Sequence, residues 1–195
     1  MTEMHFKVPS EGENVDFDFD KAGRDLLANL NLQGVRGGTT SQWNNLDAIY
    51  AHPSSGGVIY VGNATAAESM EILSGHNISH VVNCTNGAGA IPCFHKGKLK
   101  YYTFPISQWW AHVKDNNHAS VITFTDPLWA FIDSALEAGS SVLVHCLAGA
   151  HRAGTTGCAC LMHYGKMKHK EAIKTAKQLR PIIDPIGQLP QFLMR

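Results

Sequence analysis

A cysteine and an arginine lie close together in the stretch from 142 to 162, which reads VLVHCLAGAHRAGTTGCACLM. Cys146 follows a short apolar run, and the residues between it and Arg152 are mostly small and include no acidic side chain. A cysteine thiolate is a strong nucleophile. A planar guanidinium can donate to two oxygens of one phosphate group. These residue types therefore indicate nucleophilic chemistry on a bound anion.

The residues between the two suit a loop that wraps around phosphate. Gly149 has no Cβ to hinder a tight curl, so several backbone N–H groups can turn inward, and the positive end of a following helix would reinforce them. The same donors favour the thiolate form of Cys146, which makes a phosphocysteine intermediate the natural chemistry. The residues expected to bind phosphate are Leu147, Ala148, Gly149, Ala150, His151 and Arg152.

The elements that must position this loop can be read from its flanks. SVLVH (141–145) predicts a buried strand, and TTGCACLMHYGK (155–166) predicts the helix after the loop. Cys146 then lies at the carboxyl end of a strand, where open α/β sheets bind ligands. We expect His145, directly before it, to support the cysteine backbone through a buried hydrogen bond rather than to act as a base.

The pattern from residue 57 onward alternates between strands and helices. Strands are predicted at 58–62, 80–85 and 99–106, with a helix over 65–73 stopped by Gly75 and another that starts with Asp126 as N-cap and Pro127 in its first turn. Residues 107–125 are expected to form a long polar connection. This rhythm predicts an α/β fold, a central, mainly parallel twisted sheet flanked by helices in a single domain.

Composition and cysteine count limit the classes of partner and the cellular location that we expect. The chain has 195 residues, is 44% hydrophobic and carries 16 acidic and 16 basic side chains, so it offers no broad charge for nucleic acid or an anionic membrane. The odd number of cysteines and the Cys158-Ala-Cys160 spacing argue for reduced thiols, hence a cytoplasmic location with the nucleus also open. We expect residues 57–195 to form the catalytic domain and residues 1–56 to form an N-terminal extension of uncertain order, which includes a short helix near 21–30. We expect the protein to need no metal or organic cofactor.

Residues 145–152, HCLAGAHR, resemble the HCxxGxxR signature of cysteine-dependent protein tyrosine phosphatases, and their surroundings resemble the dual-specificity branch. The resemblance extends from residue 57 to about 193 and includes VIYVGNATAAES, FIDSALEAG and MKHKEAIKTAKQLRPII. It implies a phosphatase that hydrolyses phosphotyrosine, and phosphoserine or phosphothreonine, in phosphorylated protein substrates. The alternative is a phosphate-binding pseudophosphatase that serves as an interaction module.

The resemblance also implies an aspartic acid that protonates the leaving oxygen and later activates water. Asp126 is better explained as a helix cap and Asp133 as a position inside that helix. Asp115 lies in the open connection and is the predicted general acid. Because the chain has extra residues before Asp115 compared with the family, Gln108 is the alternative occupant of the acid position.

Two further positions bear on turnover and regulation. The family normally has Ser or Thr after the arginine, where its hydroxyl donates to the cysteine sulfur, but this chain has Ala153. Thr155 and Thr156 are not in register to replace it, so we expect hydrolysis of the intermediate to limit turnover. Cys84 ends a predicted strand near the loop, where it is either a redox partner that forms a disulfide with Cys146 or a plain buried cysteine.

Aromatic residues before the predicted acid have two interpretations. Trp109, Trp110, Tyr101 and Tyr102 either wall a pocket for an aromatic ring or fill the core beside the sheet. The core is the favoured interpretation for the tyrosines, and the two stay equal for the tryptophans.

Overall fold

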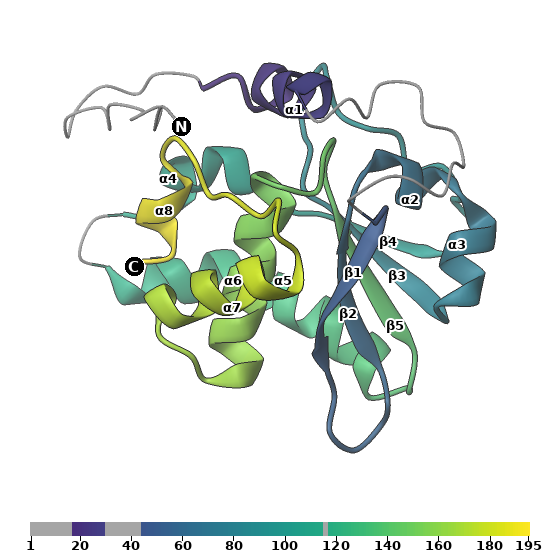
Figure 1. The fold of residues 1–195 in the computed structure, drawn as a ribbon. Helices are drawn as coiled ribbons and strands as arrows, with labels where there is room; N and C mark the ends of the chain where they lie inside the picture. Colours follow the sequence, from purple (N-terminus) through teal and green to yellow (C-terminus); the bar gives the residue numbers. More distant parts are fainter. Residues whose placement is uncertain (1–16, 30–43, 115–116) are drawn as a thin grey trace.

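The computed structural model describes residues 17–29, 44–114 and 117–195. Its centre is a five-stranded sheet in the order β1-β2-β5-β3-β4, with helices on both faces (Figure 1). β1 runs antiparallel to β2, and the other neighbouring pairs are parallel, which confirms the predicted mainly parallel α/β fold. The strands are β1 (Leu46–Ala51), β2 (Val58–Gly62), β3 (Ile78–Asn83), β4 (Lys100–Thr103) and β5 (Ser141–His145).

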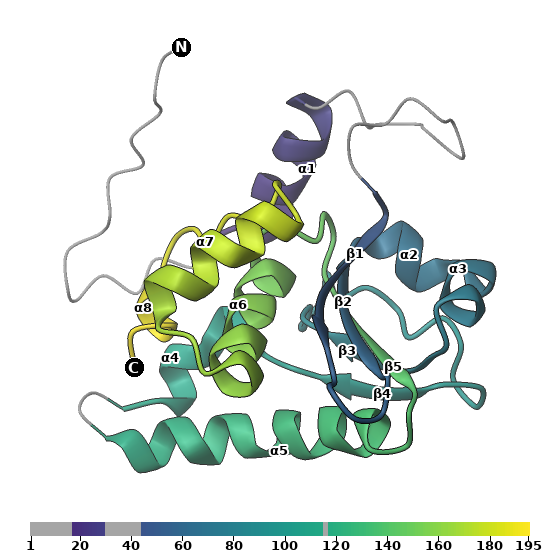
Figure 2. The ribbon, with the colours of Figure 1, turned by 60° about the horizontal axis from the view of Figure 1, so that its bottom comes forward.

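The helices fall into groups on either side of the sheet. α2 and α3 lie on one side, and α4 to α8 lie on the other (Figures 1 and 2). None of the helices within the described ranges is long and apolar enough to cross a membrane. The helices are α1 (Phe19–Asn29), α2 (Ala64–Glu68), α3 (Met70–Gly75), the 3-10 turn η1 (Ile106–Gln108), α4 (Trp109–His112), α5 (His118–Leu136), α6 (Arg152–Gly165), α7 (His169–Leu179) and α8 (Leu189–Phe192).

β5 is the central strand and is buried along its whole length. Its side chains alternate between two cores, as the pleat of a strand requires. Val142 and Val144 face the larger core under α4 to α8, whereas Leu143 faces the smaller core under α2 and α3. This burial on both faces fixes the place where β5 ends and the loop begins.

The predicted helix over 65–73 is two short helices in the structure. Ser69 interrupts them with an extended backbone, and its side chain accepts from the N–H of Ile72 to cap α3. Serine favours such caps because its hydroxyl competes for nearby backbone groups. The second helix ends at Gly75, as predicted.

The predicted start of α5 at Asp126 is wrong. α5 begins at His118, and the side chain of Asn117 caps it by accepting from the N–H of Ser120. Pro127 therefore lies inside the helix, and its missing N–H falls on the exposed side, where water can satisfy the freed carbonyl. The expected polar connection of 107–125 is consequently short, because η1, α4 and the first turns of α5 occupy most of it.

Segments before residue 57 join the fold at two points. β1 extends the sheet as an antiparallel edge strand, which the sequence pattern did not reveal. α1 corresponds to the predicted helix near 21–30 and lies across the end of the molecule where β5 leads into α6 (Figure 2).

Candidate active site

The loop between β5 and α6 starts at Cys146, and Arg152 is the first residue of α6. The N–H of Cys84 donates to the carbonyl of His145 at 2.8 Å, so the end of β5 is held against the end of β3. Gly149 has φ of +70°, and a Cβ there would lie 2.5 Å from the carbonyl oxygen of Gly62. The structure thus confirms that glycine is needed at this position.

The loop carbonyls point away from the space that the loop encloses, because distant groups bind them. The carbonyl of Leu147 accepts from the N–H of Ala64 at 3.0 Å. The carbonyl of Ala150 accepts from the N–H of Asp184 at 3.0 Å. Segments from both halves of the chain therefore hold the loop from outside.

Arg180 holds the middle of the loop in the same way. Its Nε donates to the carbonyl of Gly149 at 3.0 Å, and its Nη2 donates to the carbonyl of Ala148 at 3.3 Å. Its Nη1 donates to the carboxylate of Asp47 at 2.6 Å, which balances the charge of a side chain that is only 1% exposed. Sequence analysis missed this residue, since nothing local marks an arginine 31 residues away as a partner of the loop.

A peptide plane whose carbonyl points outward directs the neighbouring N–H inward. Among the described residues, no backbone N–H of residues 147–151 donates to another group. Successive free N–H groups in a curled loop form a concave site for an anion. The structure thus brings together the residues predicted to bind phosphate.

Arg152 completes this concave site and is only 4% exposed. Its Nε has no hydrogen-bond partner within the described part of the chain. One Nη2 donor binds the carboxylate of Asp20, and the guanidinium lies 5.9 Å from the ring centroid of Phe19. An unpaired buried donor is costly, and a bound anion would satisfy it.

His145 lies directly before the loop and His151 lies within it, both as buried, neutral side chains. Burial lowers the pKa of His145 to about 4, although the backbone of Cys146 favours the charged ring. Neither ring nitrogen has a hydrogen-bond partner of ordinary geometry across the described ranges, while the adjacent backbone of Cys146 interacts with the ring, so the supporting role of His145 stays a prediction. Burial also lowers the pKa of His151, whose Nδ1 lies 2.7 Å from the carbonyl of Asp184 and so carries the proton.

Ala153 is fully buried, and the threonines after it do not supply the missing hydroxyl. The hydroxyl of Thr155 donates to the carbonyl of His151 at 2.7 Å, and that of Thr156 donates to the carbonyl of Arg152 at 3.0 Å. A hydroxyl has one proton, so neither has one left for the Cys146 sulfur. The Thr156 oxygen instead lies 3.4 Å from the sulfur of Cys84.

The acid candidates fall in different places. Asp115, the predicted general acid, lies outside the described residues. Asp126 is exposed on α5, and Asp133 lies inside that helix, where it accepts from the hydroxyl of Tyr164 at 2.8 Å. The side-chain oxygen of Gln108 accepts from the amide of Asn86 at 2.8 Å.

The aromatic residues mostly fill the core. Trp109 is 5% exposed, and its Nε1 donates to the carbonyl of Gln188 at 3.0 Å. Tyr101 packs on the smaller core and Tyr102 on the larger one, which confirms the favoured interpretation for the tyrosines. Trp110 is 42% exposed on α4.

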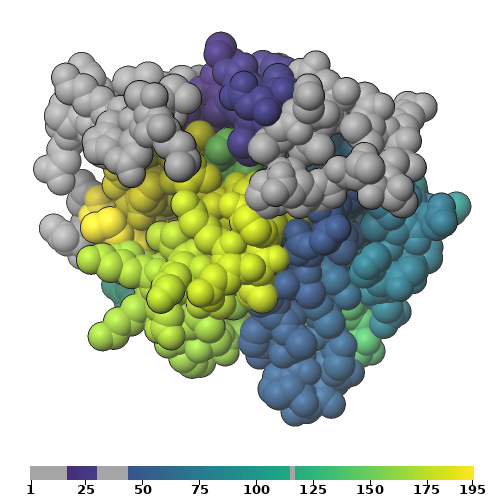
Figure 3. All heavy atoms as spheres, viewed as in Figure 1, coloured from purple at the N-terminus to yellow at the C-terminus, as the bar shows by residue number. Residues whose placement is uncertain are grey.

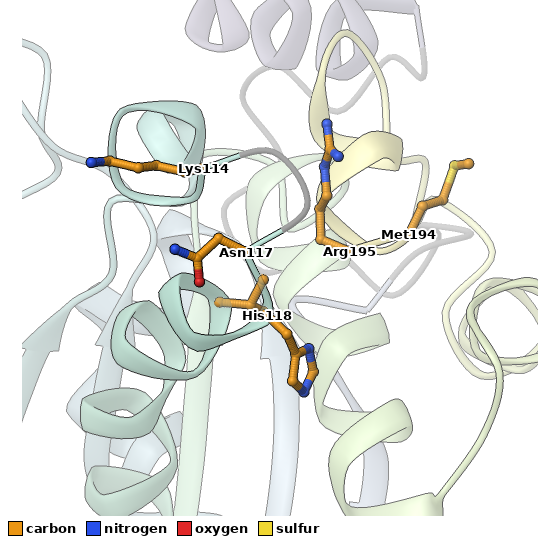
Figure 4. Close-up of a pocket in the computed structure, with 6 residues that line it drawn as sticks. Lys114, Asn117, His118, Met194 and Arg195 are labelled. Carbon is orange, nitrogen blue, oxygen red and sulfur yellow. The ribbon is translucent and has the colours of Figure 1, made fainter.

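A pocket of about 280 Å³ lies apart from the loop, between the start of α5 and the C-terminus (Figure 4). Its lining includes Lys114, His118 and Arg195 but neither Cys146 nor Arg152. Nor do the described ranges bring together three or more His, Cys, Asp or Glu side chains that could hold a metal ion. Among the described residues, the loop at the end of β5 is therefore the candidate active site.

Comparison with known proteins identifies the family of this chain. The family model for the dual specificity phosphatase catalytic domain matches residues 59–194. Mouse dual specificity protein phosphatase 1 is 33% identical over 138 residues, which are 69% of this chain and 35% of that protein. The Mpk3 phosphatase of Drosophila melanogaster is 34% identical over 140 residues, 71% and 32% of the two chains, so this chain spans about a third of such relatives.

Solved structures show the same fold at lower identity. Human DUSP28 is 20% identical with a TM-score of 0.58, and the match covers 77% of this chain and 91% of that one. DUSP15 is 22% identical with a TM-score of 0.57, over 75% and 84% of the two chains. With a family model that matches most of its length and a signature loop built as described above, this chain belongs to the dual specificity phosphatase family.

Proposed function

We propose that this chain is a protein phosphatase that hydrolyses phosphotyrosine, and phosphoserine or phosphothreonine, through a phosphocysteine intermediate. One observation carries the proposal: the carbonyls of the loop are bound from outside while its N–H groups and the Nε of Arg152 lack partners among the described residues. Such a site fits a tetrahedral oxyanion whose oxygens need several donors at once. Family membership supports the same reaction.

In the proposed mechanism, the Cys146 thiolate attacks phosphorus in line with the leaving oxygen. The S–P bond forms as the O–P bond breaks, and Asp115 gives its proton to the departing oxygen. Water then attacks phosphorus, Asp115 takes a proton from it, and the S–P bond breaks to return the thiolate and phosphate. Arg152 and the loop amides bind the equatorial oxygens, where negative charge gathers in both steps.

Steady-state hydrolysis of p-nitrophenyl phosphate and of a phosphotyrosine peptide tests the proposal. We expect the wild-type protein to hydrolyse both, and Cys146→Ser to retain phosphate binding without turnover. Equal, near-zero rates for the two proteins would contradict catalysis and leave a phosphate-binding pseudophosphatase. If the wild-type protein is active, substrate capture with Asp115→Ala should identify the phosphorylated protein partner.

Cys84 is proposed as the redox partner of Cys146. In the parallel register Asn83 pairs with His145, so the next residues, Cys84 and Cys146, lie on neighbouring chains, where strand spacing is about 4.8 Å. That spacing falls within the range of Cα separations that a disulfide spans. Burial raises the pKa of Cys84 to about 12, so Cys84 remains a thiol.

In the proposed redox step, a peroxide oxidises the Cys146 thiolate to a sulfenic acid and is itself reduced to water. The Cys84 sulfur then displaces water from that sulfenic acid, which forms the disulfide. Peptide mass mapping after peroxide treatment should show an 84–146 cross-link that Cys84→Ser loses and Cys93→Ser retains. Irreversible oxidation of Cys146 in all three proteins would contradict the pairing.

We further propose that residues 57–195 hold the catalytic residues, and that the protein acts in the cytoplasm or nucleus without a cofactor. The residues that carry the chemistry, from Cys84 to Arg180, all lie in this range, while residues 1–56 add α1 and β1. Activity that survives EDTA and disappears on thiol alkylation would support a reaction without a metal.

A further inference from the structure

α1 packs directly on the phosphate-binding loop. Phe19 is 5% exposed and belongs to the same core cluster as Cys146. Leu26 and Leu27 pack against the cluster that contains Ala148 and Ala150 of the loop. Figure 3 shows α1, in purple, seated on this end of the molecule. The helix therefore lies against the loop, on the side from which Asp20 reaches Arg152.

The opposite side of α1 faces water. Lys21 and Asp25 form an exposed ion pair at 2.7 Å, one turn apart on that side. Gly23 faces the loop, and a Cβ there would lie 3.4 Å from the Cδ2 atom of Leu147, so the backbone of the helix comes close to the loop. This division into a docked side and a solvated side is that of a helix bound to a surface.

Asp20 projects from the docked side and binds the key cation of the site. Its carboxylate accepts from the Nη2 of Arg152, and its side chain is 30% exposed, whereas that of Arg152 is 4% exposed. The Nε of the same guanidinium has no partner within the described residues. The carboxylate thus takes one of the two donors that a phosphate would bind together.

The charges of the Asp20 carboxylate and of a phosphate monoester predict which of them binds Arg152 more strongly. A carboxylate brings one negative charge, whereas a phosphate monoester brings close to two and three terminal oxygens. Phosphate can therefore accept from both guanidinium donors and from the loop amides, whereas Asp20 accepts from one guanidinium donor. Asp20 should weaken substrate binding without preventing it.

We propose that α1 is an internal pseudosubstrate: Asp20 occupies the phosphate side of Arg152, and the helix must leave the loop before a phosphorylated protein can bind. The proposal rests on the phosphatase function proposed for this loop. Loss of Asp20 should raise the fraction of molecules with an open site, and apparent affinity rises by the same factor.

The direct test compares Asp20→Asn with Asp25→Asn. Both remove one carboxylate from the same helix, but Asp25 lies on the solvated side. We expect Asp20→Asn to raise kcat/KM for a phosphotyrosine peptide about tenfold, as loss of one charge-assisted hydrogen bond implies. Asp25→Asn should match the wild type. Equal values for the two variants would overturn the proposal, as would a lower kcat for Asp20→Asn, which would make Asp20 part of the reaction.

A second test does not depend on turnover. Inorganic phosphate is added to the Cys146→Ser variant, and amide hydrogen exchange is followed in residues 20–29, with α7 as the internal reference. Faster exchange in α1 alone supports displacement of the helix. Unchanged exchange means that α1 stays in place and slower exchange means that it closes over the ligand, and either result overturns the proposal. If no protein hydrolyses phosphate esters but phosphate still displaces α1, the proposed function fails and the pseudosubstrate contact stands.

Discussion

The loop from Cys146 to Arg152 and the connection between α4 and α5 supply the two halves of the proposed chemistry, and they are built differently. The loop is buried, and its outer face is bound by Ala64, Arg180 and Asp184, all distant in sequence. In the connection, the N–H of Lys114 donates to the hydroxyl of Ser120, so this contact is local. The half that binds charge is fixed by the whole fold.

This difference follows from what each half must do. Stabilising charge on phosphate needs several donors at fixed positions, because their strength depends on orientation set before the substrate arrives. Proton transfer needs one group within hydrogen-bond reach of the leaving oxygen. The loop therefore has to be held by the rest of the fold, whereas contacts within the connection itself suffice to position one acid.

The largest effect should come from the loop. Arg152→Lys keeps a positive charge but loses the fork that binds two oxygens, so we expect kcat/KM for p-nitrophenyl phosphate to fall about 10³-fold. Thermal unfolding should confirm that the variant is folded. A value within tenfold of the wild type would show that Arg152 acts only as a point charge.

The burial of His145 should make the stability of the protein depend on pH. His145 has its pKa lowered from 6.5 to about 4 in the folded protein, so the unfolded chain binds more protons between these values. Stability is then full above pH 6.5 and falls on the order of 3 kcal/mol as pH drops to about 4. Urea unfolding of His145→Gln should lose this part of the pH dependence. Since His151 shifts in the same direction and remains in both proteins, parallel curves would contradict the prediction.

The connection should show a smaller loss of rate. Asp115→Asn removes the proposed acid, so kcat/KM for a phosphotyrosine peptide should fall about 10²-fold, and the alkaline limb of the pH–rate profile should disappear. Asp126→Asn is the matched control and should leave the profile unchanged. A wild-type profile for Asp115→Asn would contradict its role as general acid and favour Gln108 as the occupant of the acid position.

Arg180→Lys tests whether the hydrogen bonds that Arg180 makes to the outer face of the loop improve phosphate binding on its inner face. It removes two donors to loop carbonyls, each worth about 1 kcal/mol, so we expect roughly a thirtyfold rise in KM with little change in kcat. Asp47→Asn removes only the ion pair and should lower the melting temperature with a smaller change in KM. A lower melting temperature for Arg180→Lys without any change in KM would assign Arg180 to stability alone.

The smallest effect concerns the residue after Arg152. We expect rapid-quench kinetics of the wild type to show a burst, because the phosphocysteine lacks a hydroxyl that stabilises the leaving thiolate. Ala153→Ser should shrink the burst and raise the steady-state rate about fivefold, the equivalent of one hydrogen bond. Linear product release from time zero in the wild type would contradict this.

Much of the fold could be predicted because its signals are local. The apolar, β-branched run of β5 and the small residues after it predict a strand and a loop from neighbouring residues alone. The start of α5 could not be predicted from Asp126 and Pro127, because the same pair suits a helix start and an exposed site within a helix. Burial of Phe124 and Leu128 in one core decided between them.

The sequence by itself predicted Cys146 as nucleophile, Arg152 as anion-binding group and the curl of the loop at Gly149, since a thiol, a guanidinium and a glycine able to adopt positive φ are properties of single residues. Only the tertiary structure decided which way the loop peptides face, because Arg180, Ala64 and Asp184 bind their carbonyls from far along the chain. It also decided that Asp20 meets Arg152, 132 residues later. No local pattern encodes such a contact, because it depends on where folding places α1.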